Sequence, residues 1–302
     1  MTSISAPAVP APAVCVVTGA NSGIGRATAL HLAAAGYTVW GTVRSLEKAT
    51  KLKSMAEQAG VEVRLVELDV GDDESVRTGF AGLFEQTGGV VDVLVNNAGI
   101  AGNAVAEETS AAMYLDVMNI NLCGAARCWQ QVLPGMRQRR RGAVVNVTSV
   151  TGRFAALAQS PYVASKWALE GVSEELAQEV APFGVRVAII EPGVTKSAIF
   201  AKHIDTPRIS DAYDSAYRRM FQMYAAGLTH ATDPFEVGKV VHHAITSPDA
   251  TLRHTVSWGS AAMLAGRAAM TDEQWVALGI GDDDAYYDGF QRYFGVDLRD
   301  LG

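Results

Sequence analysis

Short apolar runs alternate along this chain with longer segments that have helical patterns. The apolar runs predict strands over residues 14–17, 37–43, 61–68, 91–95, 143–147 and 185–190. The longer segments predict helices over residues 26–35, 46–58, 72–86, 111–136 and 162–180, the fourth of them continuous or with a break. This alternation predicts an α/β domain in which helices cover both faces of a parallel sheet.

Polar and glycine-containing motifs directly follow several of the predicted strands. Gly19, Asn97, Ser149 and Pro192 each stand just beyond a strand end. In sheets of this class, ligands bind beyond the carboxyl ends of the strands. We therefore expect these motifs to meet at one edge of the sheet and to form one site.

A glycine-rich loop, Thr18-Gly19-Ala20-Asn21-Ser22-Gly23-Ile24-Gly25, connects the first predicted strand to the first helix. In this context, backbone N–H groups and a helix N-terminus can hold a pyrophosphate. The spacing is G-x-x-x-G-x-G and differs from the general G-x-G-x-x-G fingerprint. A single glycine turn after a strand can also be purely structural, so this loop alone leaves both interpretations open.

A tyrosine and a lysine, Tyr162 and Lys166, stand four residues apart, which places them on one face of a helix. A phenol normally titrates near ~10, and a neighbouring ammonium lowers that pKa. The pair could therefore act as an acid or base near neutral pH. Most Tyr/Lys pairs at this spacing are ordinary helix surface, but here Ser149 lies thirteen residues upstream and the glycine loop precedes both.

These motifs together resemble the short-chain dehydrogenases/reductases. The matching residues are Thr18-Gly19-x-x-x-Gly23-x-Gly25, Asp69-Val70, Asn96-Asn97-Ala98-Gly99, Asn121, Ser149, Tyr162-x-x-x-Lys166 and Pro192-Gly193. The residues around Tyr162 look most like the branch that holds hydroxysteroid and retinol dehydrogenases. The resemblance implies a single doubly wound, Rossmann-like domain with a mostly parallel seven-stranded sheet.

The resemblance also implies the catalytic roles. Tyr162 would give a proton to a carbonyl oxygen in reduction and take one in oxidation. Lys166 would lower the pKa of that phenol and hold the nicotinamide ribose. Ser149 would donate a hydrogen bond to the substrate oxygen as its charge develops. Asn121 would hold a water in a proton relay through Lys166, since Asn-x-x-Gly matches Asn121 and not Asn119.

The cofactor site implied by the resemblance draws on the ends of several strands. Its expected members are Gly19, Asn21, Ser22, Gly23, Ile24, Gly25, Arg44, Asp69, Val70, Asn97, Ala98, Gly99, Tyr162, Lys166, Pro192, Gly193, Val194 and Thr195. Two of them have alternative interpretations. Asp69 would contact the adenine ring or cap the next helix, and Thr195 would donate to the nicotinamide carboxamide or start the next loop.

Cofactor choice depends on the end of the second strand. Val43 stands where the resemblance places the acidic residue that binds the ribose hydroxyls of NAD, and Arg44 follows it. Arginine suits a phosphate because it offers charge and a fork of donors, and Ser22 could add a hydroxyl. We therefore predict NADP(H) in preference to NAD(H), although the glycine loop has no basic residue and Arg44 could point to solvent.

We expect three parts in the chain: a disordered Ala/Pro-rich tail over 1–13, the dehydrogenase domain over 14–260 and a C-terminal extension over 261–302. The extension would pack on a substrate lid at about 194–230 or on a neighbouring subunit. The apolar residues of this lid have two interpretations: they pack in the core, or they cover a lipophilic substrate. Phe154 would add to the wall of the same substrate pocket. The lid residues concerned are Phe200, Tyr213, Tyr217, Met220, Phe221, Met223 and Tyr224.

Composition excludes several other classes. With 25 basic against 32 acidic residues, the chain has no nucleic-acid signature, and the arginines at 137 and 139–141 predict a solvated loop. The three cysteines, at positions 15, 123 and 128, are too scattered for a disulfide framework or a zinc site.

No apolar run of ~18 residues predicts a membrane span, so a cytoplasmic location is expected. The resemblance implies a homodimer or homotetramer.

The predicted function is an NADP(H)-dependent oxidoreductase that interconverts a carbonyl and a secondary alcohol, on a bulky lipophilic substrate such as a steroid-like or aryl ketone. One alternative is a nucleotide-sensing regulator on the same fold, although such proteins usually lose the tyrosine or lysine that this chain keeps. Another is a nucleotide-sugar epimerase or dehydratase, whose typical G-x-x-G-x-x-G loop does not match.

Overall fold

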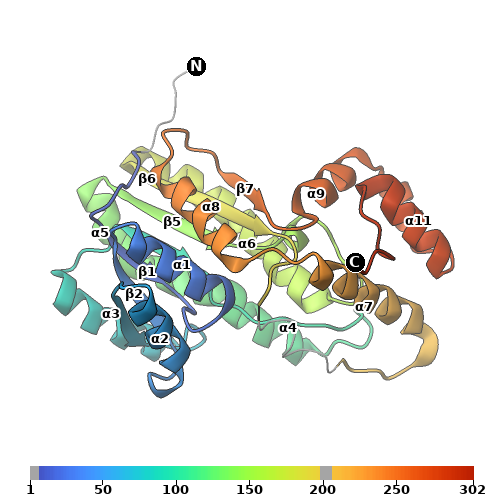
Figure 1. Cartoon of the computed structure of the whole chain (residues 1–302), viewed down its shortest axis with the longest axis horizontal. Helices are drawn as coiled ribbons and strands as arrows, with labels where there is room; N and C mark the ends of the chain where they lie inside the picture. The colour runs from blue at the N-terminus through green and yellow to red at the C-terminus, as the bar shows by residue number, and fades with distance from the viewer. Residues whose placement is uncertain (1–6, 198–205) are drawn as a thin grey trace.

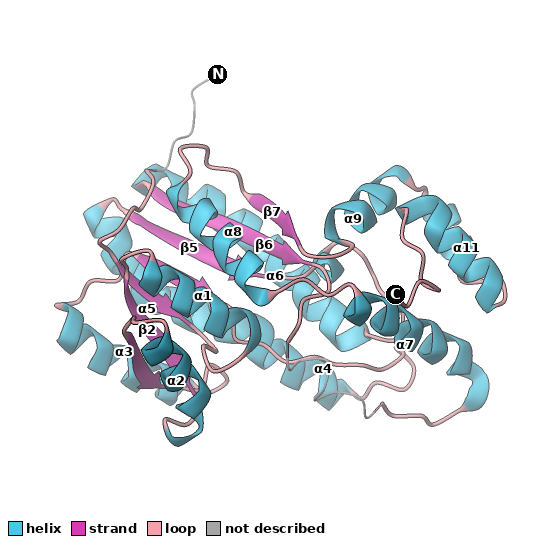
Figure 2. Cartoon of the chain, in the orientation of Figure 1, coloured by secondary structure: helices cyan, strands magenta, loops and turns pink. Residues whose placement is uncertain are grey.

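The computed structural model describes residues 7–197 and 206–302. Seven parallel strands form one sheet in the order β3-β2-β1-β4-β5-β6-β7 (Figures 1 and 2). The strands are β1 (Val14–Val17), β2 (Thr38–Val43), β3 (Val63–Glu67), β4 (Val93–Asn96), β5 (Gly142–Val147), β6 (Val185–Pro192) and β7 (Arg253–Val256). The chain reverses direction across the sheet between β3 and β4, so β1 and β4 mark the switch point where such sheets bind ligands.

Helices cover both faces of the sheet, as the sequence predicted. They are α1 (Gly23–Ala34), α2 (Thr50–Gln58), α3 (Asp73–Thr87), α4 (Ala111–Met118), α5 (Gly124–Arg139), α6 (Ser160–Val180), α7 (Asp214–Thr229), α8 (Pro234–Thr246), α9 (Ser260–Ala269), α10 (Asp272–Ala277) and α11 (Asp283–Phe294). Buried residues of α1, α2 and α8 share one apolar core with the sheet, and those of α3, α5 and α6 share a second core on the opposite face. Alternate residues of β5 enter the two cores, because successive side chains of a strand point to opposite faces.

The long helix predicted over 111–136 is interrupted. One π-helical turn, η2 (Asn119–Cys123), separates α4 from α5 and contains the buried Asn121. The helix predicted over 46–58 also begins as a 3₁₀ turn, η1 (Glu47–Ala49), before α2. The apolar pattern predicted both segments and allowed a break in the first, but it could not show where the break falls or that each segment changes its helical pitch.

The predicted disordered tail is wrong for residues 7–13. Val9 is fully buried, and its N–H donates to the Ile245 carbonyl of α8 at 2.8 Å. The Tyr37 hydroxyl donates to the Val9 carbonyl at 2.7 Å. One apolar side chain and two hydrogen bonds therefore anchor a segment that has no periodic pattern, while residues 1–6 lie outside the described part.

The C-terminal helices α9, α10 and α11 lie beyond the sheet, and α9 and α11 stand beside α7 in Figure 1. Buried residues of α9 and α11, among them Phe290 and Phe294, form a third core with Phe154 and with Met223 of α7. From α7, Arg219 pairs with Asp283 at 2.9 Å. The C-terminal extension therefore packs on the predicted lid of its own chain, which is one of the two alternatives predicted for it.

Candidate active site

A cavity of about 860 Å³ opens at the carboxyl edge of the sheet, around the β1–β4 switch point. Its walls come from the segments that follow β1, β2, β3, β4, β5 and β6, together with α6 and α7. All the predicted cofactor-binding residues line it except Gly25, and so do Ser149, Tyr162 and Lys166. The expectation that the strand-end motifs meet at one edge is therefore correct as a matter of geometry.

The glycine loop is built for close packing against the end of β4. Gly19 has φ +65°, and a Cβ there would lie 2.9 Å from the Cα of Ala98. The Thr18 hydroxyl accepts hydrogen bonds from the N–H groups of Asn97 and Ala98 at 2.9 and 3.0 Å. A Cβ at Gly25 would lie 2.5 Å from the Gly19 carbonyl oxygen, so Gly25 shapes the loop from behind the cavity.

The N-terminus of α1 lies at the same cavity. Ser22 is the N-cap residue, yet its side chain makes no capping hydrogen bond. The first-turn N–H groups of a helix have no intrahelical partners and carry the positive end of the helix dipole. Since Ser22, Gly23 and Ile24 line the cavity, the loop and helix start can receive an anionic group such as a pyrophosphate.

Ser149, Tyr162 and Lys166 lie together where β5 ends and α6 begins. The Lys166 ammonium donates to the Val147 carbonyl at 2.9 Å and lies 5.6 Å from the centre of the Tyr162 ring. Ser149 and Tyr162 share a hydrogen bond that acts to lower the pKa of the phenol. The Ser149 hydroxyl also accepts from the Thr151 N–H at 3.2 Å, which fixes its direction.

The pKa expected for Tyr162 from the sequence is wrong for the protein alone. Burial raises the pKa of the Tyr162 phenol to about 12, and the hydrogen bond with Ser149 opposes this only in part. Burial also lowers the pKa of the Lys166 ammonium to about 8. The spacing of the pair predicted their proximity but could not show that Lys166 is buried and Tyr162 half-buried, which favours the neutral forms of both groups.

Asn121 is held by the interrupted helix and does not line the cavity. Its side-chain oxygen accepts from the Ile100 N–H at 2.8 Å, and its Nδ2 donates to the Ile100 carbonyl and to Ser165, each at 2.9 Å. These contacts tie η2 to the loop after β4 and to α6. Its role in a water relay stays a prediction.

Asp69 and Thr195 both line the cavity, as predicted, but they differ in their contacts. The helix cap predicted as an alternative for Asp69 is supplied by Asp72, whose carboxylate accepts from the Ser75 N–H. Asp69 instead accepts from the Gly71 N–H at 2.9 Å. The Thr195 hydroxyl lies 2.7 Å from that of Ser257, next to the loop after β7.

Arg44 is exposed at the rim of the cavity, directly after β2. Sequence reasoning missed a second basic residue there, because it looked for one in the glycine loop. Lys48 lines the same rim, and its carbonyl accepts from the Asn21 side chain of the glycine loop at 3.2 Å. The sequence did contain a signal for this residue, because Lys48 follows Arg44 by four residues, a spacing that places two side chains on the same side of a helical turn.

Of the apolar lid residues that the structure describes, only some line the cavity. Met223 and Tyr224 line it, whereas Tyr217 is fully buried and donates to the Glu108 carboxylate at 2.7 Å. Tyr213 contacts Glu107. For Tyr217 the core interpretation is therefore the correct one.

The remaining aromatic predictions concern three other side chains. Met220 and Phe221 pack in the small core around Tyr217. Phe200 lies outside the described residues. Phe154 lines the cavity as expected, and its ring meets those of Trp275 and Phe294 edge-on at 5.1 and 5.2 Å. The C-terminal extension therefore supports this wall from behind.

Within residues 7–197 and 206–302, no cluster of three or more histidine, cysteine or carboxylate side chains could hold a metal ion. None of the described helices is both long and apolar enough to cross a membrane.

Comparison with known proteins agrees with this geometry. The profile of the short chain dehydrogenase family matches residues 13–208. The 17-beta-hydroxysteroid dehydrogenase type 1 of Mus musculus is 35% identical over 256 residues, which are 80% of this chain and 73% of that protein. The NADPH-dependent pterin aldehyde reductase of Arabidopsis thaliana is 40% identical over 185 residues, 61% of this chain and 75% of that one.

A solved structure extends the likeness to the whole fold. A short-chain dehydrogenase from Streptomyces avermitilis is 34% identical, with a TM-score of 0.75, and the match covers 90% of this chain and 99% of that one. The chain belongs to the short-chain dehydrogenase/reductase family and is an oxidoreductase. The names of its relatives cover both steroid and pterin substrates, so they do not identify its own.

Proposed function

We propose that this enzyme interconverts a carbonyl compound and a secondary alcohol with NADP(H), on a bulky lipophilic substrate. The observation that carries the proposal is that one cavity joins the glycine loop and the N-terminus of α1 to the group Ser149, Tyr162 and Lys166. A phosphate-binding loop and a proton donor at the two ends of one cavity are what dinucleotide-dependent carbonyl reduction requires.

The residues present fit a nicotinamide dinucleotide. The backbone of the glycine loop and the start of α1, whose N-cap side chain makes no capping hydrogen bond, would hold the pyrophosphate. Asp69 and Val70 would border the adenine, and Asn97 to Gly99 and Pro192 to Thr195 would border the nicotinamide half. When bound, the nicotinamide supplies the hydride for reduction or accepts it in oxidation.

Within the site, Tyr162 would hold the proton that reaches the substrate oxygen. A phenol whose pKa is raised to about 12 keeps its proton at neutral pH, which suits donation in the reductive direction. Ser149 would donate to the same oxygen as negative charge develops there. Lys166 would orient the nicotinamide ribose and replenish the proton, and Asn121 would hold a water that leads from Lys166 to solvent.

The direct test is the oxidation of NADPH or NADH in the presence of ketosteroids, retinoids, aryl ketones and short β-keto esters. Turnover of at least one carbonyl class with a cofactor preference supports the proposal. Tight cofactor binding without turnover of any of these compounds would favour a nucleotide-sensing protein instead. Conversion of a nucleotide sugar would favour the epimerase or dehydratase alternative.

The preference for NADP(H) rests on the two basic residues at the rim. Arg44→Ala is expected to raise the Kd of NADPH about tenfold, because a charge-assisted hydrogen bond to the 2′-phosphate is lost. Lys48→Ala is expected to act in the same direction with a smaller effect. NADH binding should change little in either variant, and cofactor fluorescence titration measures both constants.

Lys51→Ala is the matched control, since this exposed lysine of α2 does not line the cavity. Equal losses for the two cofactors in Arg44→Ala would mean that Arg44 does not read the phosphate. The name of the Arabidopsis relative, which is NADPH-dependent, supports the same preference.

The preference for a bulky substrate rests on the apolar wall formed by Phe154, Met223, Tyr224 and Met263. Burying apolar area is worth ~25 cal/mol per Å², so Tyr224→Ala should raise the KM of a multi-ring ketone about tenfold or more. The KM of a three-carbon ketone should change far less. Tyr217→Ala, in the core, should instead lower the melting temperature and affect both substrates alike. If the ratio of the KM of the multi-ring ketone to that of the three-carbon ketone were the same in Tyr224→Ala and Tyr217→Ala, the proposed lipophilic wall would be contradicted.

We also propose a homodimer or homotetramer and a cytoplasmic location. Leu115 on α4 and Trp167 on α6 are 70% and 50% exposed, and these two helices pack side by side. An exposed apolar pair on adjacent helices supports burial by a second copy. The three free cysteines support a reducing compartment.

A further inference from the structure

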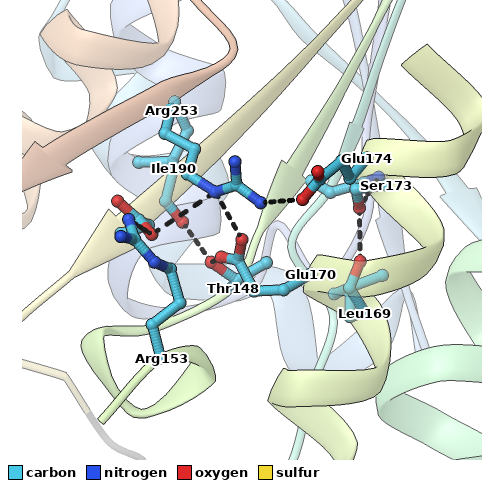
Figure 3. A network of polar contacts seen from close by, with 10 residues as sticks. Thr148, Arg153, Leu169, Glu170, Ser173, Glu174, Ile190 and Arg253 are labelled. Atoms are coloured by element: carbon cyan, nitrogen blue, oxygen red, sulfur yellow. Dashed lines mark hydrogen bonds and ion pairs between the residues drawn. The ribbon is translucent and has the colours of Figure 1, made fainter. Parts of the chain in front are cut away.

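Directly behind the cavity, a network of charged side chains around two buried carboxylates joins α6 to the carboxyl ends of β5 and β6 and to the start of β7 (Figure 3). Glu170 of α6 and Glu191 of β6 are only 4% and 1% exposed. Arg253 of β7 lies 3.1 Å from Glu170 and 3.9 Å from Glu191, and Arg153 lies 3.1 Å from Glu191. A buried carboxylate is costly unless it is paired and hydrogen-bonded, so this arrangement needs a reason.

Glu170 connects this network to the catalytic group on two sides. One oxygen accepts a hydrogen bond from the Thr148 hydroxyl at 2.6 Å, and Thr148 directly precedes Ser149. Glu170 also follows Lys166 by one helical turn, and its negative charge opposes the effect of burial on the pKa of that ammonium. The chain after Ser149 approaches closely as well, since a Cβ at Gly152 would lie 2.8 Å from the Cγ of Glu170.

Resting on the function proposed above, we propose that Glu170 is a positioning residue for the reaction. It holds the strand end that carries Ser149, through Thr148, and it keeps the buried Lys166 ammonium charged. Burial raises the pKa of Glu170, and hydrogen bonds from the Thr148 hydroxyl and from Arg253 oppose that rise and hold the carboxylate in place. Lys166 and Ser149 reach the substrate and cofactor side of the cavity, whereas Glu170 acts on both from behind.

A plainer interpretation is that Glu170 only anchors Arg253. Glu174 allows these two interpretations to be distinguished. It binds the same arginine at 2.6 Å, but its side chain is 56% exposed and it lies two helical turns beyond Lys166. An anchoring role toward Arg253 alone predicts that neither Glu170→Gln nor Glu174→Gln shifts the pH dependence of kcat. A role toward Lys166 predicts an effect of Glu170→Gln alone.

The first experiment measures kcat for carbonyl reduction against pH in both variants. Lys166 faces Tyr162 and the Val147 carbonyl, and Glu170 faces Thr148, Glu191 and Arg253. Removing the Glu170 charge leaves the Lys166 ammonium without its nearby carboxylate, so Lys166 should lose its proton more easily. The fall of kcat on the alkaline side of the pH profile should therefore move about one unit to lower pH. Glu174→Gln should coincide with the wild type. Coincidence of Glu170→Gln with the wild type, or equal shifts in both variants, would overturn the proposal.

The second experiment does not need turnover. The pKa of Lys166 is about 8 in the folded protein, against an ordinary value of 10.5, so unfolding takes up a proton between these values. The lysine therefore makes stability rise with pH through that window, and subtracting the pH curve of Lys166→Met isolates this contribution. In Glu170→Gln the rise should begin about one unit lower. An unchanged onset refutes the role of Glu170 even if no carbonyl substrate is found, whereas absence of turnover alone refutes only the proposed function.

Discussion

Replacing Tyr162 with phenylalanine is expected to lower kcat for ketone reduction by ~10²–10⁴-fold, the usual contribution of a positioned proton donor. The substitution removes one hydroxyl and keeps the ring that lies beside the Lys166 ammonium. The fold should therefore survive, and cofactor binding should change little. Steady-state kinetics with NADPH, together with a cofactor titration and a thermal melt, measure all three quantities.

Tyr217→Phe is the matched control for that experiment. Its phenol is also buried and hydrogen-bonded, to Glu108, but it does not line the cavity. We expect a lower melting temperature and a kcat within a few-fold of the wild type. Turnover close to normal in Tyr162→Phe would show that the proton comes from another group, and Ser149 would be the next residue to test.

Most of the sheet was predictable from the sequence because its inner strands are buried on both faces. Parallel strands of this kind read as continuous apolar runs. With the edge strand β3, whose residues are partly exposed, six strands were predicted within two residues of their observed ends. β7 (Arg253–Val256) has no such run, since it is an edge strand with polar side chains and pairs only with β6. The family resemblance implied that a seventh strand exists but did not place it along the chain.

The cavity residues were predictable for a different reason. Strand ends in a parallel sheet converge whatever the side chains are, so motifs that follow strands must meet. What the sequence could not give is what each side chain faces. The helical stripe that contains Tyr217 and Tyr224 has one period, yet Tyr217 faces Glu108 in a core while Tyr224 faces the cavity. The contact of Val9 with Ile245 is equally invisible to local pattern.

Burial is also the reason why the pKa values of Tyr162 and Lys166 differ from those expected from the sequence. Lys166→Met is therefore the second substitution to test. Loss of the ammonium should reduce turnover by ~10²-fold or more, because proton delivery to Tyr162 and the hold on the ribose are both removed. Activity assays with NADPH measure this effect.

Stability should respond in a way that an ordinary surface lysine would not produce. Keeping this ammonium charged in the folded protein, with its pKa lowered from 10.5 to about 8, costs on the order of 3 kcal/mol at neutral pH. Methionine removes that cost but leaves the Val147 carbonyl without its donor, a loss of about 1–3 kcal/mol. The melting temperature near pH 7 should therefore change little or rise, while the stability that the wild type gains between pH 8 and 10.5 should disappear. A large drop in melting temperature at every pH would instead mean that Lys166 mainly supports the fold.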